Sequence, residues 1–398
     1  MIQDKISKLS LMTPPSFVRG ILKAGDCDDI ISFAGGLPNP ISFPQEALRE
    51  SAGKIISNYG SRVFQYAATA GLPQLREYIA SRWKQIYNMN IEADDIIITT
   101  GSQQALDLVS KVLINYGDKI IIEEPAYLGA IQAFTQYGPQ FLPVPMEEDG
   151  ADTTIFEEQL KKGQVKFVYL VPNFQNPSGI TYTSEKRKKV FELVRKYDCI
   201  LIEDDPYGEL SFDGCPKGYI SQSDLSSSIL LGTFSKTVTP GMRLGFMVIK
   251  DPILRKYINT AKEAADLHTN IFSQYILYDY LIHNDLNKHI AKIRELYQNQ
   301  CTTMLDSMEK EFPDVVTFTK PTGGMFIWAN LNGIMSSMEL FHEAKKQKVA
   351  FVPGNPFYTD GRETDTLRLN YTNASQDMIR EGIARLGSIL IINGLSES

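Results

Sequence analysis

The sequence is poor in the residues that bind metals or form disulfides. It has only four cysteines and four histidines. Cys27, Cys199, Cys215 and Cys301 are far apart and form no CxxC pair, which predicts reduced thiols rather than a disulfide framework or a zinc site. The histidines are equally dispersed, so we expect no metal centre. Reduced thiols are typical of a cytoplasmic protein.

Long apolar runs and an excess of basic residues are also lacking. No uninterrupted apolar stretch reaches the roughly 20 residues that a membrane helix needs. The first residues contain no apolar run that could form the core of a signal peptide. The formal net charge is −7, whereas nucleic acids and anionic membranes are bound by clustered cations. We therefore expect a cytoplasmic protein with neither nucleic acid nor membrane as a partner.

Length and composition indicate a globular protein of two domains. The hydrophobic share is 43% and the charged share 22%, values typical of folded chains. A chain of 398 residues is too long for one simple core. We expect an N-terminal segment over 1–40, a large domain over 41–285 and a small domain over 286–398.

Strand and helix patterns alternate through the middle of the chain. Apolar runs predict strands at 95–100, 119–124, 166–171, 199–204, 229–234 and 244–249. Helices are expected at 72–87, 102–115, 127–137 and 184–197. The strand runs are almost continuously apolar, as in strands that are covered on both faces. The sequence therefore predicts an α/β fold with a mostly parallel sheet between two layers of helices.

The pattern changes after residue 285. We expect helices at 286–311, 338–347 and 376–391, and strands near 315–318, 325–330, 349–352 and 366–370. This order predicts a second, smaller α+β domain. We expect the N-terminal segment to join it.

Candidate binding residues follow the first three strands of the predicted sheet. Ligands of open α/β sheets bind beyond the carboxyl ends of the strands. The turn before Ser102 opens a helix, whose free N–H groups suit a phosphate, although Ser102 could simply cap the helix. Tyr127 could stack on a flat ring or pack in the core. Asn176 precedes a proline and could donate to a ligand oxygen or only form a turn.

Charged residues follow the next two strands. Glu203, Asp204 and Asp205 end an apolar strand, and buried carboxylates need a partner. A protonated pyridine nitrogen would serve, although a turn or cap is an equal alternative. Lys236 could lose solvation and act as a nucleophile toward carbonyls, whereas an isolated lysine is usually a solvated surface group. Arg243 lies seven residues on, and all these residues fall at one edge of one sheet.

A family resemblance joins these separate signals. The motifs that carry it are GGLPNP (35–40), QYAATAG (65–71), GSQQAL (101–106), EEPAY (123–127), PNFQNPSG (172–179), EDDPYGEL (203–210), TFSK with GMRLGF (233–246) and LRLNY (367–371). With them the chain resembles the fold type I aminotransferases of class I/II, which depend on pyridoxal 5′-phosphate (PLP). It is most similar to the 2-aminoadipate/kynurenine group. The resemblance implies a large domain with a mostly parallel seven-stranded sheet.

The resemblance also implies catalytic roles for particular residues. Lys236 is expected to hold PLP as a Schiff base and to move a proton at the substrate Cα. Asp204 is expected to face the pyridine nitrogen and keep it protonated. Tyr207 and Asn176 would donate to the phenolic oxygen of the ring, and Tyr127 would stack on it.

Further residues are expected to hold the cofactor phosphate and the substrate. The phosphate residues are Ser102, Gln103, Thr233, Ser235 and Arg243, where Thr233 stands in place of a serine common in relatives. Tyr66 resembles a tyrosine that reaches the phosphate of the neighbouring subunit, which implies a homodimer with shared sites. Arg368 is expected to bind the substrate α-carboxylate, next to Asn176 and Gly36. Arg19, in a segment expected to cover the site, could bind an acidic side chain or remain a surface charge.

The implied activity is transfer of an amino group between an L-amino acid and a 2-oxo acid such as 2-oxoglutarate. The amino acid would be 2-aminoadipate, aromatic or aliphatic. Another PLP reaction, by a β-lyase or a decarboxylase, is the alternative, because one cofactor supports all of these. A transcription regulator with a related domain would need a winged helix, for which the ~40 residues before the sheet domain are too few. A dehydrogenase would need G-x-G-x-x-G, which GSQQAL lacks.

Overall fold

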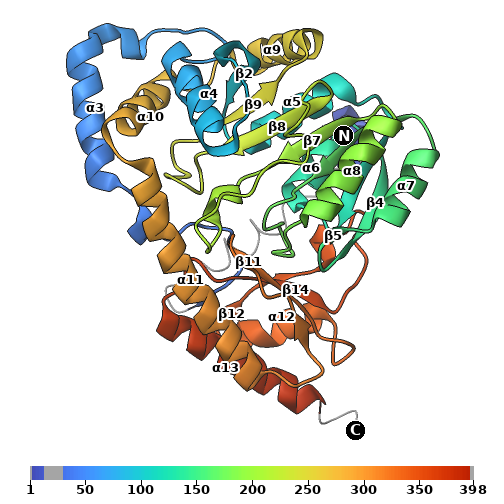
Figure 1. The fold of residues 1–398 in the computed structure, drawn as a ribbon. Coiled ribbons are helices and arrows are strands. Elements are labelled where there is room, and N and C mark those ends of the chain that lie inside the picture. The colour runs from blue at the N-terminus through green and yellow to red at the C-terminus, as the bar shows by residue number, and fades with distance from the viewer. Residues whose placement is uncertain (1, 13–29, 395–398) are drawn as a thin grey trace.

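The computed structural model describes residues 2–12 and 30–394, so Arg19 and Cys27 lie outside the described residues. The described chain forms a large sheet of eight strands, a smaller sheet of four strands and a two-stranded sheet, with helices against the first two (Figure 1). The large sheet has the strand order β2 (Ile96–Thr99), β9 (Gly245–Ile249), β8 (Ser228–Thr233), β7 (Ile200–Asp204), β6 (Val165–Leu170), β3 (Lys119–Glu124), β4 (Gln140–Glu147) and β5 (Gly150–Ala151). The predicted α/β fold is confirmed.

The sheet is mostly parallel in its middle and antiparallel at both ends. Strands β8, β7, β6, β3 and β4 run parallel to one another. Strand β9 is antiparallel to both neighbours, and β5 is antiparallel to β4. The expected number of seven strands was wrong by one, because the two-residue β5 extends the edge beyond β4. All six strands predicted from apolar runs are present, whereas β4 was not among them.

Helices cover both faces of the large sheet, as alternate residues along each strand require. Ile120 and Ile122 of β3 belong to the core formed with α5 (Ser102–Leu113) and α6 (Leu128–Thr135). Ile121, between them, packs in the core formed with α7 (Thr153–Lys161) and α8 (Ser184–Lys196). Toward the β2 end of the sheet, the same face as Ile121 carries α4 (Pro73–Tyr87) and α10 (Ile271–His283).

Other helices extend these layers. Helix α9 (Pro252–Asp266) packs against α5, and α3 (Gln45–Tyr59) packs against α10. The sequence did not predict α3, α7, α9 or α10. The shorter helices are η1 (Ile2–Lys5), α1 (Lys8–Met12), η2 (Pro40–Ser42), η3 (Gly60–Phe64), η4 (Ala93–Asp95), η5 (Gly208–Leu210) and η6 (Asn355–Phe357). Among the described residues, no helix is both long and apolar enough to cross a membrane.

The smaller sheet is antiparallel and has the order β10 (Thr317–Phe318), β11 (Phe326–Asn330), β14 (Thr366–Asn370) and β13 (Val352–Pro353). Helices α11 (Leu286–Glu311), α12 (Ser337–Lys346) and α13 (Gln376–Gly394) lie around it in the lower part of Figure 1. The single strand expected near 349–352 is two strands. One part pairs with β14, and the other, β12 (Val349–Ala350), pairs in parallel with β1 (Ile31–Ser32).

Candidate active site

A cavity of about 850 Å³ lies where the loops of the large sheet meet the smaller sheet. That volume suits a small-molecule ligand. Eleven of the predicted site residues line it: Gly36, Ser102, Gln103, Tyr127, Asn176, Tyr207, Thr233, Ser235, Lys236, Arg243 and Arg368. Asp204 lies buried behind the lining, Tyr66 lies elsewhere on the surface, and Arg19 is outside the described residues. The structure therefore gathers residues from most of the motifs around one space.

Lys236 lies three residues beyond the end of β8, on the wall of the cavity. Its Nζ donates a hydrogen bond to the carbonyl oxygen of Gly36 at 2.8 Å. Burial, followed by the nearby cations Arg368 and Arg243, lowers the pKa of Lys236 to about 8. A substantial fraction of the amine is therefore unprotonated just above neutral pH, and only that form attacks a carbonyl.

Asp204 ends strand β7 and is almost completely buried. Its Oδ2 accepts a hydrogen bond from the Tyr169 hydroxyl at 2.9 Å, while Oδ1 has no hydrogen-bond partner among the described residues. Burial raises the pKa of Asp204 to about 7, against the opposing Tyr169 hydrogen bond and with a smaller contribution from Asp205. A buried carboxylate oxygen without a donor is costly, so a ligand N–H that reaches it would be bound favourably.

The two neighbouring acids have partners within the protein. Glu203 accepts hydrogen bonds from the backbone N–H groups of Ile220 at 2.6 Å and Ser221 at 2.9 Å. Asp205 accepts one from the backbone N–H of Gly208 at 2.7 Å. The turn contacts offered as the alternative therefore account for Glu203 and Asp205. Only Asp204 of the three has an oxygen without a partner among the described residues.

One end of the cavity combines a helix N-terminus with Arg243. Helix α5 begins at Ser102 with Gly101 at the N-cap position, so the alternative that Ser102 caps the helix is wrong. Gly101 has φ +76°, and a Cβ there would lie 2.7 Å from Nη2 of Arg243. Only glycine allows this approach. The first N–H groups of α5, the Arg243 guanidinium and the hydroxyl pair of Thr233 and Ser235, 2.9 Å apart, form a site suited to a phosphate.

Aromatic and amide side chains line the middle of the cavity. Tyr127 is the N-cap residue of α6, and its hydroxyl donates to Oε1 of Gln103 at 3.4 Å. A Cβ at Gly129 would lie 2.5 Å from Cζ of Tyr127, so the glycine leaves room for the ring. Tyr207 is buried, and burial raises its pKa well above the ordinary value, so it remains a hydroxyl donor. Asn176 lies beside it and hydrogen bonds with it.

Arg368 lies on β14 and is only 3% exposed. Its Nη1 donates to Oδ1 of Asn176 at 2.8 Å, and its Nη2 donates to the carbonyl oxygen of Ala34 at 2.7 Å. The guanidinium lies 4.3 Å from the centre of the Phe326 ring, and its Nε has no partner among the described residues. Burial lowers the pKa of Arg368 to about 10, which still leaves a cation at neutral pH. Such a cation is suited to binding a carboxylate.

Tyr66 does not contribute to the cavity of its own chain. Its side chain is 78% exposed and lies edge-on to the ring of His268, with the ring centres 5.9 Å apart. The sequence also missed Tyr169 and Phe326, which contact Asp204 and Arg368. Both occupy predicted strands, where an aromatic side chain is usually a core residue. The sequence offered one clue for Tyr169. A tyrosine in an apolar strand buries its hydroxyl, and a buried hydroxyl needs a hydrogen-bond partner.

Comparisons with known proteins give one consistent result. A family model described as aminotransferase class I and II matches residues 39–386. Aromatic-amino-acid aminotransferase 1 of Thermococcus litoralis is 40% identical over 390 residues, which cover 96% of this chain and 93% of that protein. The crystal structure of Pyrococcus horikoshii kynurenine aminotransferase in complex with PMP, with KYN as substrates and KYA as products, has a TM-score of 0.93. It is 42% identical and covers 98% of both chains.

A second solved structure carries a cofactor–substrate adduct. It is the alpha-aminoadipate aminotransferase from Thermus thermophilus, complexed with N-(5′-phosphopyridoxyl)-L-leucine. It has a TM-score of 0.93 and 36% identity, and it covers 100% of both chains. The similarity thus extends over both sheets and the cavity between them.

Proposed function

Because this chain belongs to the class I and II aminotransferase family, we propose that it transfers the amino group of several L-amino acids to a 2-oxo acid such as 2-oxoglutarate. The chain is an aminotransferase whose cofactor is pyridoxal 5′-phosphate. The observation that carries the proposal is the Lys236 amine, with its pKa lowered to about 8, in the cavity that Arg368 also lines.

The residues around the cavity fit this cofactor. PLP, when bound, supplies a carbonyl that reacts with amines and a protonated ring that withdraws electrons from the substrate Cα. The unpartnered Oδ1 of Asp204 suits the pyridine N–H, and the end of the cavity at Ser102 and Arg243 suits the phosphate. Tyr127 would lie against the ring, while Tyr207 and Asn176 would donate to its phenolic oxygen.

The protein side chains then have distinct tasks. Lys236 would bind the cofactor and afterwards move a proton at the substrate Cα, for which a pKa near 8 is well placed. Asp204 would hold the ring nitrogen protonated by its charge. Arg368, held by Asn176 and the Ala34 carbonyl, would orient the substrate α-carboxylate. Gly36 would lie beside the substrate, since its carbonyl accepts from Lys236.

The proposed substrates are 2-aminoadipate, aromatic amino acids such as kynurenine, and aliphatic amino acids. The relatives named above act on aromatic amino acids, kynurenine and alpha-aminoadipate, and one carries a leucine adduct. Each of these donors has the same α-carboxylate, so the Arg368 contact cannot select among them. Selection would depend on the residues around the substrate side chain.

We further propose a homodimer in which Tyr66 serves the site of the neighbouring subunit. The exposed ring of Tyr66 supports this, because a tyrosine that is 78% exposed has little role within its own chain. We also propose domain limits near residues 40 and 285, supported by the start of α11 at Leu286 and the pairing of β1 with β12. A cytoplasmic location is supported by the free thiols of Cys199, Cys215 and Cys301.

A donor and acceptor screen of the PLP-loaded protein tests the proposed function. 2-Aminoadipate, kynurenine and leucine would each be offered with and without 2-oxoglutarate. We expect stoichiometric formation of the 2-oxo acid and glutamate, and no steady turnover without the acceptor. Release of carbon dioxide or of the substrate side chain without an acceptor would instead support a decarboxylase or a β-lyase.

A further inference from the structure

A buried ion pair lies directly behind the proposed phosphate end of the cavity. Lys262, on α9, has no exposed side-chain area, and its Nζ lies 2.8 Å from Oδ1 of Asp266, one helical turn later. Burial lowers the pKa of Lys262, and Asp266 opposes that effect. The Asp266 side chain is 26% exposed, so the pair extends from the buried Lys262 amine to the protein surface.

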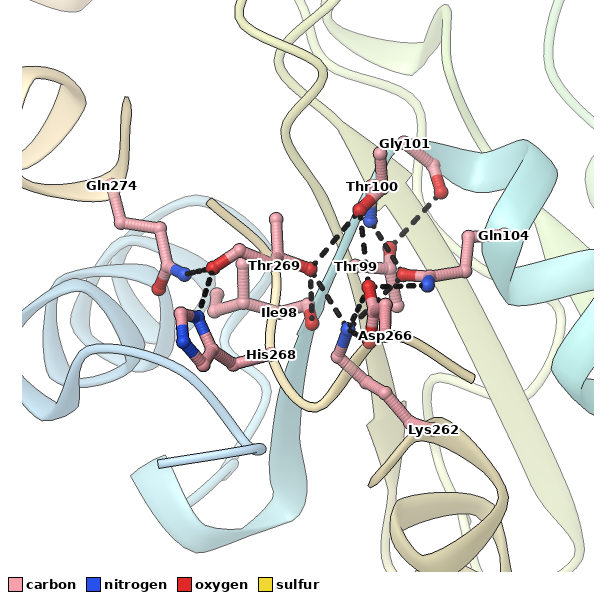
Figure 2. A network of polar contacts seen from close by, with 10 residues as sticks. All are labelled: Ile98, Thr99, Thr100, Gly101, Gln104, Lys262, Asp266, His268, Thr269 and Gln274. Atoms are coloured by element: carbon pink, nitrogen blue, oxygen red, sulfur yellow. Dashed lines mark hydrogen bonds and ion pairs between the residues drawn. The ribbon is translucent and has the colours of Figure 1, made fainter. Parts of the chain in front are cut away.

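The pair is the centre of a polar network that joins three segments, shown in Figure 2. Asp266 Oδ2 accepts a hydrogen bond from Nε2 of Gln104, in the first turn of α5, at 2.6 Å. Gln104 Oε1 in turn accepts from Nζ of Lys262 at 3.2 Å and from the backbone N–H of Thr100 at 2.8 Å. Lys262 also donates to Thr269 Oγ1 at 2.9 Å, and Thr269 donates to the carbonyl oxygen of Ile98 on β2 at 3.3 Å.

The network holds the loop between β2 and α5 from its inner side. Thr100 immediately precedes Gly101, and its carbonyl oxygen accepts from Nη2 of Arg243 at 3.4 Å. The backbone N–H of Thr100 donates to Gln104, so the N–H and the C=O of Thr100 both have hydrogen-bond partners. Ser102, which follows Gly101, lines the cavity at the proposed phosphate site. A shift of Lys262 or Asp266 would therefore move the N-terminus of α5 and the Arg243 contact together.

We propose that Lys262 and Asp266 are positioning residues for the cofactor phosphate: their ion pair sets the position of the Thr100–Gly101 loop and of the first turn of α5. This inference rests on the proposed function, because it assumes that the phosphate binds at Ser102 and Arg243. Stability alone is a poor explanation for the pair. Replacing a buried ion pair by apolar residues of similar volume often leaves the stability of a protein unchanged or increases it.

The test compares two ligands that differ only in the phosphate. Cofactor-free protein would be titrated with PLP and with pyridoxal, and binding would be followed by absorbance. In Lys262→Met, which keeps the chain length and removes the charge, we expect PLP affinity to fall on the order of tenfold, with pyridoxal affinity unchanged. Lys161→Met is the matched control, because Lys161 also pairs with an acid one turn away but is 59% exposed. We expect no change in that variant.

A double variant separates positioning from stability. Lys262→Met combined with Asp266→Leu replaces the pair with apolar side chains and avoids an unpaired charge. We expect this variant to unfold at about the wild-type temperature and still to bind PLP on the order of tenfold more weakly. Recovery of PLP affinity together with stability would overturn the inference, as would an equal loss of affinity for PLP and pyridoxal. If wild-type protein bound the two ligands equally, the phosphate site itself would be wrong, and the proposed function would need revision first.

Discussion

Replacing Asp204 by asparagine should stabilise the cofactor-free protein at alkaline pH. The ordinary pKa of the carboxyl is 3.8, and burial raises it to about 7 in the folded protein. The folded state therefore retains its proton at pH values where the unfolded state has lost it, so this group lowers the free energy of unfolding as pH rises from about 4 to 7. Ionisation of Asp204 lowers the free energy of unfolding by at most about 4 kcal/mol well above pH 7. About 2–3 kcal/mol of this decrease occurs between pH 5 and pH 8.

The measurement is the free energy of unfolding of wild-type and Asp204→Asn protein, without cofactor, at pH 5 and pH 8 and at one protein concentration. The free energy of unfolding of the variant relative to that of the wild type should rise by about 1–3 kcal/mol from pH 5 to pH 8. This is less than the upper value because the folded protein can relax around the charged carboxylate. Asp377→Asn is the control, because Asp377 is an exposed residue paired with Arg380, and its effect should be near zero. An advantage that is equal at both pH values, or larger at pH 5, would refute the reasoning.

Three further predictions concern activity and assembly. Asp204→Asn should keep PLP bound and lose most of its turnover, because an amide cannot hold the ring proton by charge; a severe loss in Asp205→Asn with a mild one in Asp204→Asn would reverse the assignment. Sedimentation should show at least a homodimer at assay concentration, since Tyr66 is expected to serve the partner site, and a fully active monomer would contradict this. Arg19→Ala should lower kcat/KM selectively for 2-aminoadipate relative to an aromatic donor, by ~1–3 kcal/mol. Equal small effects on both donors would leave Arg19 a surface charge.

Most strands that lead to the site could be predicted, because strands buried on both faces give continuous apolar runs. Strand β4 was missed since Pro143 and Pro145 break such a run. The structure accommodates both prolines because β4 pairs with β3 on one side, while β5 covers only Met146 and Glu147 on the other. Helix α10 was missed for a different reason. It is apolar almost all round, so it shows no periodic face.

The site was predictable as a set of residues at one sheet edge, but not in its internal contacts. The sequence could not decide between Asp204 and Asp205 from their chemistry. That decision depends on the turn at Gly208, whose N–H binds Asp205 and leaves Oδ1 of Asp204 without a partner among the described residues. The placing of Arg368 against Asn176 also depends on how the two sheets pack, since 192 positions separate the two residues.

Borohydride reduction tests most directly whether Lys236 carries the cofactor. PLP-loaded protein would be reduced with sodium borohydride, digested, and its peptides mapped by mass spectrometry. We expect the phosphopyridoxyl label on the peptide that contains Lys236 and its absence from a Lys236→Ala variant, which should also lose its transaminase turnover. A label on Lys262 or another lysine, or full turnover by Lys236→Ala, would contradict the account.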